Sequence, residues 1–222
     1  MTVARGFPPI SRENTALTIV DMQKDFLDDG AACFIPGGRR VVPAVSRLLE
    51  AFRHEELPVI HVITVWQEDG VDISPFTTSD ELIKRGLRKG EPGTDPVEEL
   101  TPIPGEYVLQ KTRYSGFYGT ELEMLLRSLG VVYPVVVGVC TNYCVRSTVH
   151  DASFRDFLAI VPSDCATSYT EEEHLQTLKD IETGFGWVKS SDEILSLLGI
   201  EVKAPPREHK EKSESTPATS PK

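Results

Sequence analysis

The sequence has no excess of positive charge and no long apolar run. Its 222 residues carry a formal net charge of −11 at pH 7, whereas surfaces that bind nucleic acid or anionic membranes need clustered Lys and Arg. A membrane-spanning helix needs about 20 consecutive apolar residues, and no run in the sequence approaches that length. We therefore expect neither nucleic acid nor a membrane as a partner.

Targeting and disulfide signals are also scarce. Residues 1–14 are too polar for a secretory signal peptide. The chain has 4 cysteines, and so few in a chain of this length, without such a signal, indicate free thiols in a reducing compartment. The sequence therefore predicts a cytoplasmic protein.

The two ends of the chain differ from its centre. Pro8 and Pro9 prevent early regular structure, so residues 1–14 are predicted to form an irregular arm. Residues 204–222 cannot bury an apolar core and are predicted to be a disordered tail. Residues 15–203 are enough for one domain with a sizeable core and too few for two.

Strand patterns alternate with helical patterns along this domain. The predicted strands are residues 16–20, 59–65, 107–110, 135–137, 158–161 and 187–188. The predicted helices are residues 40–56, 119–129, 171–182 and 191–198, with one more after residue 141. This alternation predicts an α/β fold, a three-layer α/β/α arrangement with a central, mainly parallel sheet. Residues 68–105 have weak periodicity, and so long a loop suggests a lid or a subunit contact.

Residues 131–152 (VVYPVVVGVCTNYCVRSTVHDA) are the most informative stretch. A β-branched run predicts a buried strand that stops at Gly138, and Thr141 or Asn142 could then cap a helix. Apolar and small side chains recur at helical spacing: Val145, Thr148, Val149 and Ala152. Cys144 would lie in the first turn, where the helix dipole and unpaired backbone N–H groups favour a thiolate. Without other evidence, Cys144 could equally be a small buried hydrophobe.

Three predicted strands end on a residue with useful chemistry: Asp21, Lys111 and, through the sharp turn, Cys144. The carboxyl ends of parallel strands share one edge of the sheet, so we expect these side chains to meet. Lys111 would stabilise the thiolate, and Asp21 would act as general acid and base. Backbone N–H groups of Cys140 and Cys144 would form an oxyanion hole.

No histidine offers an alternative base for Cys144. His150 follows six residues later and points away around the helix, and His61 lies within a strand, as a core histidine does. The remaining histidines have polar surroundings: His54, His174 and His209. No His, Cys and Asp cluster has metal-ligand spacing, so we predict neither a metal nor another cofactor. Cys33 and Cys165 are interpreted as structural.

Three motifs together resemble the isochorismatase-like cysteine hydrolases. They are residues 19–26 (IVDMQKDF), 111–117 (KTRYSGF) and 138–145 (GVCTNYCV), in the family's order and at suitable separations. The resemblance covers about residues 14–200. It implies an Asp/Lys/Cys triad, here Asp21, Lys111 and Cys144, and a cis peptide before Cys140. It further implies cleavage of C–N bonds in amides or ureido compounds, and a homo-oligomer, either a dimer or a tetramer.

Departures from particular family members narrow the activity. Nicotinamidases carry an Asp-x-His metal site after the second strand, where residues 65–70 read VWQEDG, which argues against nicotinamide. Cys144 argues against cleavage of the isochorismate vinyl ether, because true isochorismatases lack this nucleophile. Residues 113–117 and 181–188 (IETGFGWV) resemble ureidoacrylate amidohydrolases.

Candidate substrate contacts lie beside the predicted triad: Phe26, Trp66, Gln67, Tyr114 and Tyr143. Ordinary packing explains each aromatic equally well. The leading hypothesis is an amidohydrolase that forms a thioester on Cys144. The same triad could instead hydrolyse an ester or a cyclic imide. A redox-sensing role for the Cys140 and Cys144 pair would leave Asp21 and Lys111 without a purpose.

Overall fold

The computed structural model describes residues 6–77 and 84–201. The strands are β1 Thr15–Val20, β2 Val59–Thr64, β3 Tyr107–Lys111, β4 Tyr133–Val139, β5 Ile160–Pro162, β6 Ala166–Thr167 and β7 Trp187–Lys189. The helices are α1 Lys24–Leu27, α2 Val42–His54, α4 Leu122–Ser128, α5 Arg146–Ser153, α6 Glu171–Gly184 and α7 Ser191–Leu197. Single 3-10 turns span Arg12–Asn14, Gly38–Val41, Pro92–Thr94 and Glu98–Leu100, and Thr141–Val145 forms a π-helical turn.

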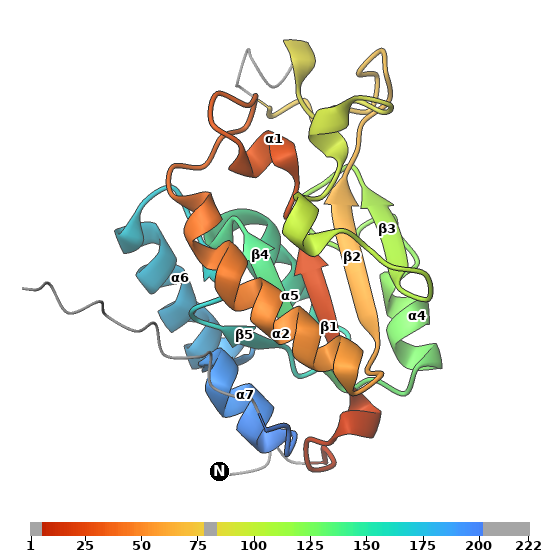
Figure 1. Ribbon diagram of the computed structural model, residues 1–222, viewed down its shortest axis with the longest axis vertical. Coiled ribbons are helices and arrows are strands. Elements are labelled where there is room, and N and C mark those ends of the chain that lie inside the picture. The colour runs from red at the N-terminus through yellow and green to blue at the C-terminus, as the bar shows by residue number, and fades with distance from the viewer. Residues whose placement is uncertain (1–5, 78–83, 202–222) are drawn as a thin grey trace, which may run out of the picture.

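The strands form one sheet in the order β3-β2-β1-β4-β5-β7, and β6 pairs with β4. The strand pairs in the described residues are parallel. The predicted α/β fold with a central parallel sheet is therefore confirmed. In Figure 1 the arrowheads of β1, β2 and β3 point the same way, toward α1 and the long segment after β2.

Two apolar layers cover the sheet. On one face α2 and α7 pack against β1 and β4 through side chains such as Leu48, Phe52 and Ile194. On the other face α4, α5 and α6 contribute Leu126, Val149 and others. β1, β2 and β4 are buried along their whole length, as expected of central strands between two helix layers.

Local sequence explains several boundaries. α2 begins with Pro43 in its first turn, where a missing N–H costs nothing. Thr170 and Ser190 each cap a helix in a capping box with a glutamate three residues later. The helix predicted for residues 119–129 begins only at Leu122, because Gly119 has a positive φ of 69° that a helix cannot contain.

The ends of the chain and the long loop stand as follows. Residues 202–222, which include the predicted tail, and residues 1–5 of the predicted arm lie outside the described residues. The described part of the arm is irregular apart from one 3-10 turn. The 68–105 segment contains two of the 3-10 turns, and its Arg88 forms an isolated bridge with Trp66, two residues after the end of β2. None of the described helices is long and apolar enough to cross a membrane.

Candidate active site

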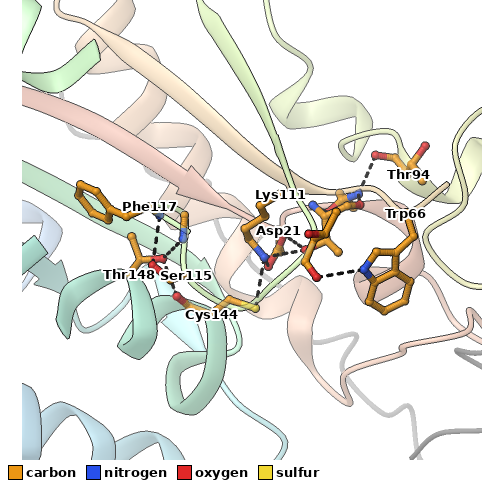
Figure 2. Close-up of polar contacts among 12 residues, drawn as sticks. Asp21, Trp66, Thr94, Lys111, Ser115, Phe117, Cys144 and Thr148 are labelled. Carbon is orange, nitrogen blue, oxygen red and sulfur yellow. Dashed lines mark hydrogen bonds and ion pairs between the residues drawn. The ribbon is translucent and has the colours of Figure 1, made fainter. Parts of the chain in front are cut away.

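Three strand ends bring Asp21, Lys111 and Cys144 together at one edge of the sheet. The Lys111 Nζ lies 2.7 Å from the Asp21 Oδ2 and 3.6 Å from the Cys144 Sγ. Figure 2 shows the Lys111 ammonium between the carboxylate and the sulfur. Asp21 and Lys111 are almost fully buried, whereas Cys144 is 7% exposed. The sulfur is therefore the member of the group that an entering molecule can reach.

The backbone at this edge has an unusual local shape. Asp21 has a φ of +54°, in the left-handed region that a non-glycine residue rarely adopts. Such strain persists only where the surrounding structure enforces it, and it is concentrated at functional sites. Gly138 lies against the end of β1, where a Cβ atom would come within 2.0 Å of the Val20 carbonyl oxygen. Any side chain at position 138 would therefore push β4, and with it the turn that carries Cys144, away from the end of β1 and Asp21.

Thr64, at the end of β2, connects the two charged groups. Its hydroxyl donates to the Asp21 Oδ1 over 2.8 Å and accepts from the Lys111 Nζ over 2.6 Å. The sequence reading did not identify Thr64, although a polar residue at the end of a buried strand could have signalled it. The hydroxyl fixes the carboxylate and the ammonium relative to each other.

Gln23 holds the segment above the site. Its amide donates to the carbonyls of Thr64 and Thr94, both over 2.9 Å, and accepts from the Thr64 N–H over 2.9 Å. Asp25, two residues later, accepts from the Leu87 N–H over 2.6 Å. These two residues of the 19–26 motif therefore tie the 87–94 segment to the sheet edge.

A cavity of about 710 Å³ opens above the Cys144 sulfur. Its walls are mainly aromatic and include four predicted substrate contacts: Phe26, Trp66, Tyr114 and Tyr143. Side chains that the sequence reading did not assign to a pocket also line it, among them Cys33, Phe34, Phe76, Arg113 and Tyr169. Gln67 does not line this cavity. It is exposed and borders a separate depression beside Glu68 and Asp69, because the chain turns outward after Trp66.

Comparison with known proteins identifies the family. A model of the isochorismatase domain matches residues 15–193, which is most of the chain. The chain belongs to the isochorismatase family. The resemblance to isochorismatase-like cysteine hydrolases that the three motifs predicted is thereby confirmed.

Individual relatives and solved structures also resemble this isochorismatase-family chain over most of its length. A ureidoacrylate amidohydrolase RutB from Pantoea ananatis is 34% identical, over 90% of this chain and 87% of its own. A cysteine hydrolase from Pseudomonas syringae superimposes with a TM-score of 0.81 at 26% identity, covering 89% of this chain and 98% of its own. An N-carbamoylsarcosine amidase from Thermoplasma acidophilum gives a TM-score of 0.68 at 31% identity, covering 81% and 97%.

The nucleophile turn of this isochorismatase-family protein differs from the predicted helix start. Cys144 lies in the π-helical turn Thr141–Val145, and α5 begins only at Arg146. The predicted cap by Thr141 or Asn142 is wrong, because no side chain caps this turn. Thr141 instead contacts the Nδ1 of His174 over 2.9 Å, and Asn142 accepts from the Ser168 hydroxyl over 2.5 Å. His174, on α6, is 7% exposed, so it braces the turn from behind.

Charges and burial determine the proton positions. Burial raises the pKa of the Cys144 thiol well above its ordinary value, and the Asp21 charge raises it further, whereas the Lys111 ammonium lowers it. Our expectation that the turn would favour a thiolate is therefore wrong for the resting site. Burial alone would lower the pKa of Lys111, but the charges of Asp21 and Cys144 outweigh it and raise that pKa. These directions favour an ammonium on Lys111 and a thiol on Cys144 in the resting site.

The backbone around Cys140 matches what the resemblance implied. The peptide bond between Val139 and Cys140 is cis. The Cys140 carbonyl accepts from the N–H groups of Tyr143 and Val145, over 3.1 and 3.2 Å. Burial raises the pKa of the Cys140 thiol to about 12, while a hydrogen bond from Tyr169 partly offsets that rise. Cys140 therefore remains a neutral thiol beside the nucleophile.

The other candidate residues lie away from the reactive group. His61 is buried and contacts Glu106 over 3.0 Å, and His150 stacks on Phe185 at 3.7 Å between ring centroids. Both agree with the interpretation that no histidine serves Cys144. Cys165 lies in the core, whereas Cys33, which we interpreted as structural, borders the cavity. The described residues contain no group of three or more His, Cys, Asp or Glu side chains that could hold a metal ion.

Proposed function

We propose that this protein is a cysteine-dependent amidohydrolase, which cleaves a C–N bond other than a peptide bond in a small amide or ureido compound. One observation carries the proposal: a single ammonium, Lys111, contacts both the Asp21 carboxylate and the Cys144 sulfur, and that sulfur lines a cavity. Relatives named as a ureidoacrylate amidohydrolase and an N-carbamoylsarcosine amidase support the bond type.

In the first half of the reaction, the Cys144 sulfur attacks the substrate carbonyl carbon while Asp21 takes the thiol proton. Lys111 stabilises the thiolate as it forms, which offsets the raised pKa of the thiol. The negative charge that develops on the substrate oxygen is held by the backbone N–H groups of Cys140 and Cys144. The C–N bond then breaks, and Asp21 returns its proton to the leaving nitrogen.

In the second half, water attacks the thioester on Cys144. Asp21 accepts the proton of that water, the carbon–sulfur bond breaks, and the thiolate recovers the proton from Asp21. The products are a carboxylic acid from an amide, or a carbamate from a ureido compound. The triad therefore returns to its starting charges, and the residues alone supply every proton transfer.

A trapping experiment with a panel of amides, ureido compounds, esters and cyclic imides tests this function. We expect ammonia or amine release from the C–N substrates and, by mass spectrometry, a covalent adduct on Cys144 with an aldehyde analogue. Cys144→Ala should lose turnover. Cys33→Ala is the matched control, since Cys33 lines the same cavity and should retain turnover within a few-fold. Undiminished hydrolysis by Cys144→Ala would refute the proposal, and release from esters or imides alone would change the bond assigned.

A redox-sensing role has less support. Sensor cysteines are accessible and have low pKa values, whereas burial raises the pKa of both Cys140 and Cys144. We also propose a cytoplasmic location, which the four free cysteines favour. The oligomer implied by the resemblance, a dimer or tetramer, remains a proposal that light scattering after gel filtration would measure.

A further inference from the structure

Arg113 is a motif residue to which the mechanism gives no role. It lies two residues after Lys111 and lines the cavity. Its Nη1 donates to the carbonyls of Asp72 and Thr112, over 2.7 and 2.8 Å. A guanidinium has five N–H donors, so these two bonds hold the side chain in place and leave the Nε and Nη2 donors for another acceptor.

No acidic side chain neutralises Arg113 among the described residues. Its hydrogen bonds within them go to backbone carbonyls, and it forms no ion pair there. The nearby Asp72 carboxylate instead accepts from the Gln67 N–H over 2.9 Å. Asp21 is 0% exposed and already bonded to Lys111 and Thr64. Among the described residues, the cavity lining contains no Asp or Glu. The positive charge therefore acts on whatever enters the cavity.

From this arrangement we infer that Arg113 is an anion subsite and that the substrate is a ureido or amide acid; the inference rests on the proposed function. The carboxylate of the substrate accepts from the planar guanidinium, which matches it in a two-bond arrangement. The scissile carbonyl at the other end of the substrate lies over Cys144. The mainly aromatic walls reduce the local dielectric and strengthen the pairing.

The charge of the subsite favours a carboxylic acid. A phosphate dianion would call for more than one cation or a ring of backbone N–H groups. Among the described residues that line the cavity, Arg113 is the only Lys or Arg. We therefore assign a carboxylate.

A matched pair of substrates tests the subsite. 3-Ureidopropionate and N-propylurea share the ureido group and chain length and differ in a carboxylate against a methyl group. We expect the wild-type kcat/KM to be about 10- to 100-fold higher for the acid, the range for a hydrogen bond to a charged group. Arg113→Met should remove that preference and leave kcat/KM for N-propylurea within threefold. Arg113→Lys, which keeps the charge and loses the planar fork, should retain part of the preference.

Arg146→Met is the control, because Arg146 begins α5 and does not line the cavity. It removes the same charge and should leave the preference intact. Equal wild-type rates for both compounds, or an equal loss on both in Arg113→Met, would overturn the subsite while hydrolysis itself would still support the proposed function. A purely structural role for Arg113 predicts the equal loss.

Binding decides the case in which neither compound is hydrolysed. Calorimetric titration of 3-ureidopropionate into the Cys144→Ala protein needs no turnover. We expect binding that weakens about 10- to 100-fold when Arg113→Met is added, and N-propylurea binding that does not change. Absence of any difference between the two proteins would overturn the subsite. Absence of turnover in the wild-type panel bears on the proposed function alone.

Discussion

Two buried ionic clusters pack against this sheet, and only one faces a cavity. The first is the pair of Asp21 and Lys111, whose side chains are both 0% exposed. The second joins Arg53 on α2, His61 on β2 and Glu106 before β3, with Glu106 7% exposed and His61 1%. Both link strands that are distant in sequence. A buried charge pair alone therefore does not distinguish a reactive site from a structural one.

The difference lies in how completely each cluster is satisfied. Glu106 accepts two hydrogen bonds from Arg53, over 2.7 and 3.0 Å, one from His61 and one from the Ile103 N–H, both over 3.0 Å. Both carboxylate oxygens are engaged, the Oε2 by three partners. The Lys111 ammonium instead directs one contact to the Cys144 sulfur at the cavity floor. The reactive cluster therefore differs from the structural one in a single respect: its ammonium contacts a nucleophile, the Cys144 sulfur, which can form a bond to a substrate.

The largest contrast should come from neutralising one carboxylate in each cluster. Asp21→Asn removes the proton acceptor, so we expect kcat to fall by about 10²- to 10⁴-fold. Glu106→Gln should leave kcat within a few-fold and lower the free energy of unfolding by about 3 kcal/mol, because Arg53 loses its buried partner. Steady-state kinetics with the best panel substrate and urea unfolding measure the two effects.

The reverse pattern would break the comparison. If Glu106→Gln impaired kcat as strongly as Asp21→Asn at equal folded fraction, the second cluster would belong to the catalytic machinery. Arg53→Met provides an independent check, since it disrupts the same cluster from α2 and should also act on stability alone.

A smaller effect should follow from removing the hydroxyl that joins the two charged groups of the site. Thr64→Val keeps the shape but leaves Asp21 and Lys111 with one hydrogen bond fewer each. We expect kcat to fall about tenfold, the value of roughly one hydrogen bond. Thr64→Ser restores the hydroxyl and should stay within about twofold of wild type by the same reasoning. Equal loss in both variants would show that packing at Thr64, and not its hydroxyl, matters.

The smallest effect concerns how stability depends on pH. Burial lowers the pKa of His61, with the same direction for His150 and His174. Below about pH 6.5 the unfolded chain binds a proton that the folded chain refuses. The unfolding free energy should therefore decrease as pH falls from 7.5 to 5.5, by at most about 1.4 kcal/mol per pH unit for each histidine.

Substitutions in the two clusters should affect the pH dependence of the unfolding free energy differently. His61→Gln should reduce the slope of unfolding free energy against pH. Cys144→Ala should leave the slope unchanged, because the raised pKa of Cys144 keeps the thiol protonated throughout this range. Urea unfolding at several pH values checks both, and an altered slope in Cys144→Ala would mean that the resting sulfur titrates near neutrality.

Much of the fold follows from local sequence. Runs rich in apolar and β-branched residues predict β1, β2 and β4, and the apolar spacing of residues 40–56 predicts a helix that the structure has at Val42–His54. The sheet edge also followed, since the residues at the ends of parallel strands must share it. β6 was missed because two residues carry no periodicity.

Properties that depend on three-dimensional packing could not be read in advance. The raised pKa of Cys144 depends on its burial and on the Asp21 charge, whereas the sequence suggested only a position near a helix start. His174 looked polar because α6 is rich in charge, yet it faces the nucleophile turn. Gln67 and Trp66 are neighbours in extended backbone, where successive side chains point to opposite sides, and only Trp66 lines the cavity.

The Gln23 amide determines how molecules reach the sulfur. It joins Thr94 to Thr64, so the roof cannot lift at that point without disturbing the hydroxyl between the two charged groups. Other parts of the cavity wall are open to solvent: Phe76, Tyr114 and Tyr143 are 88%, 55% and 40% exposed. Exchange of Phe76 for a smaller side chain would widen the passage, whereas Tyr114 and Tyr143 also stand as candidate substrate contacts.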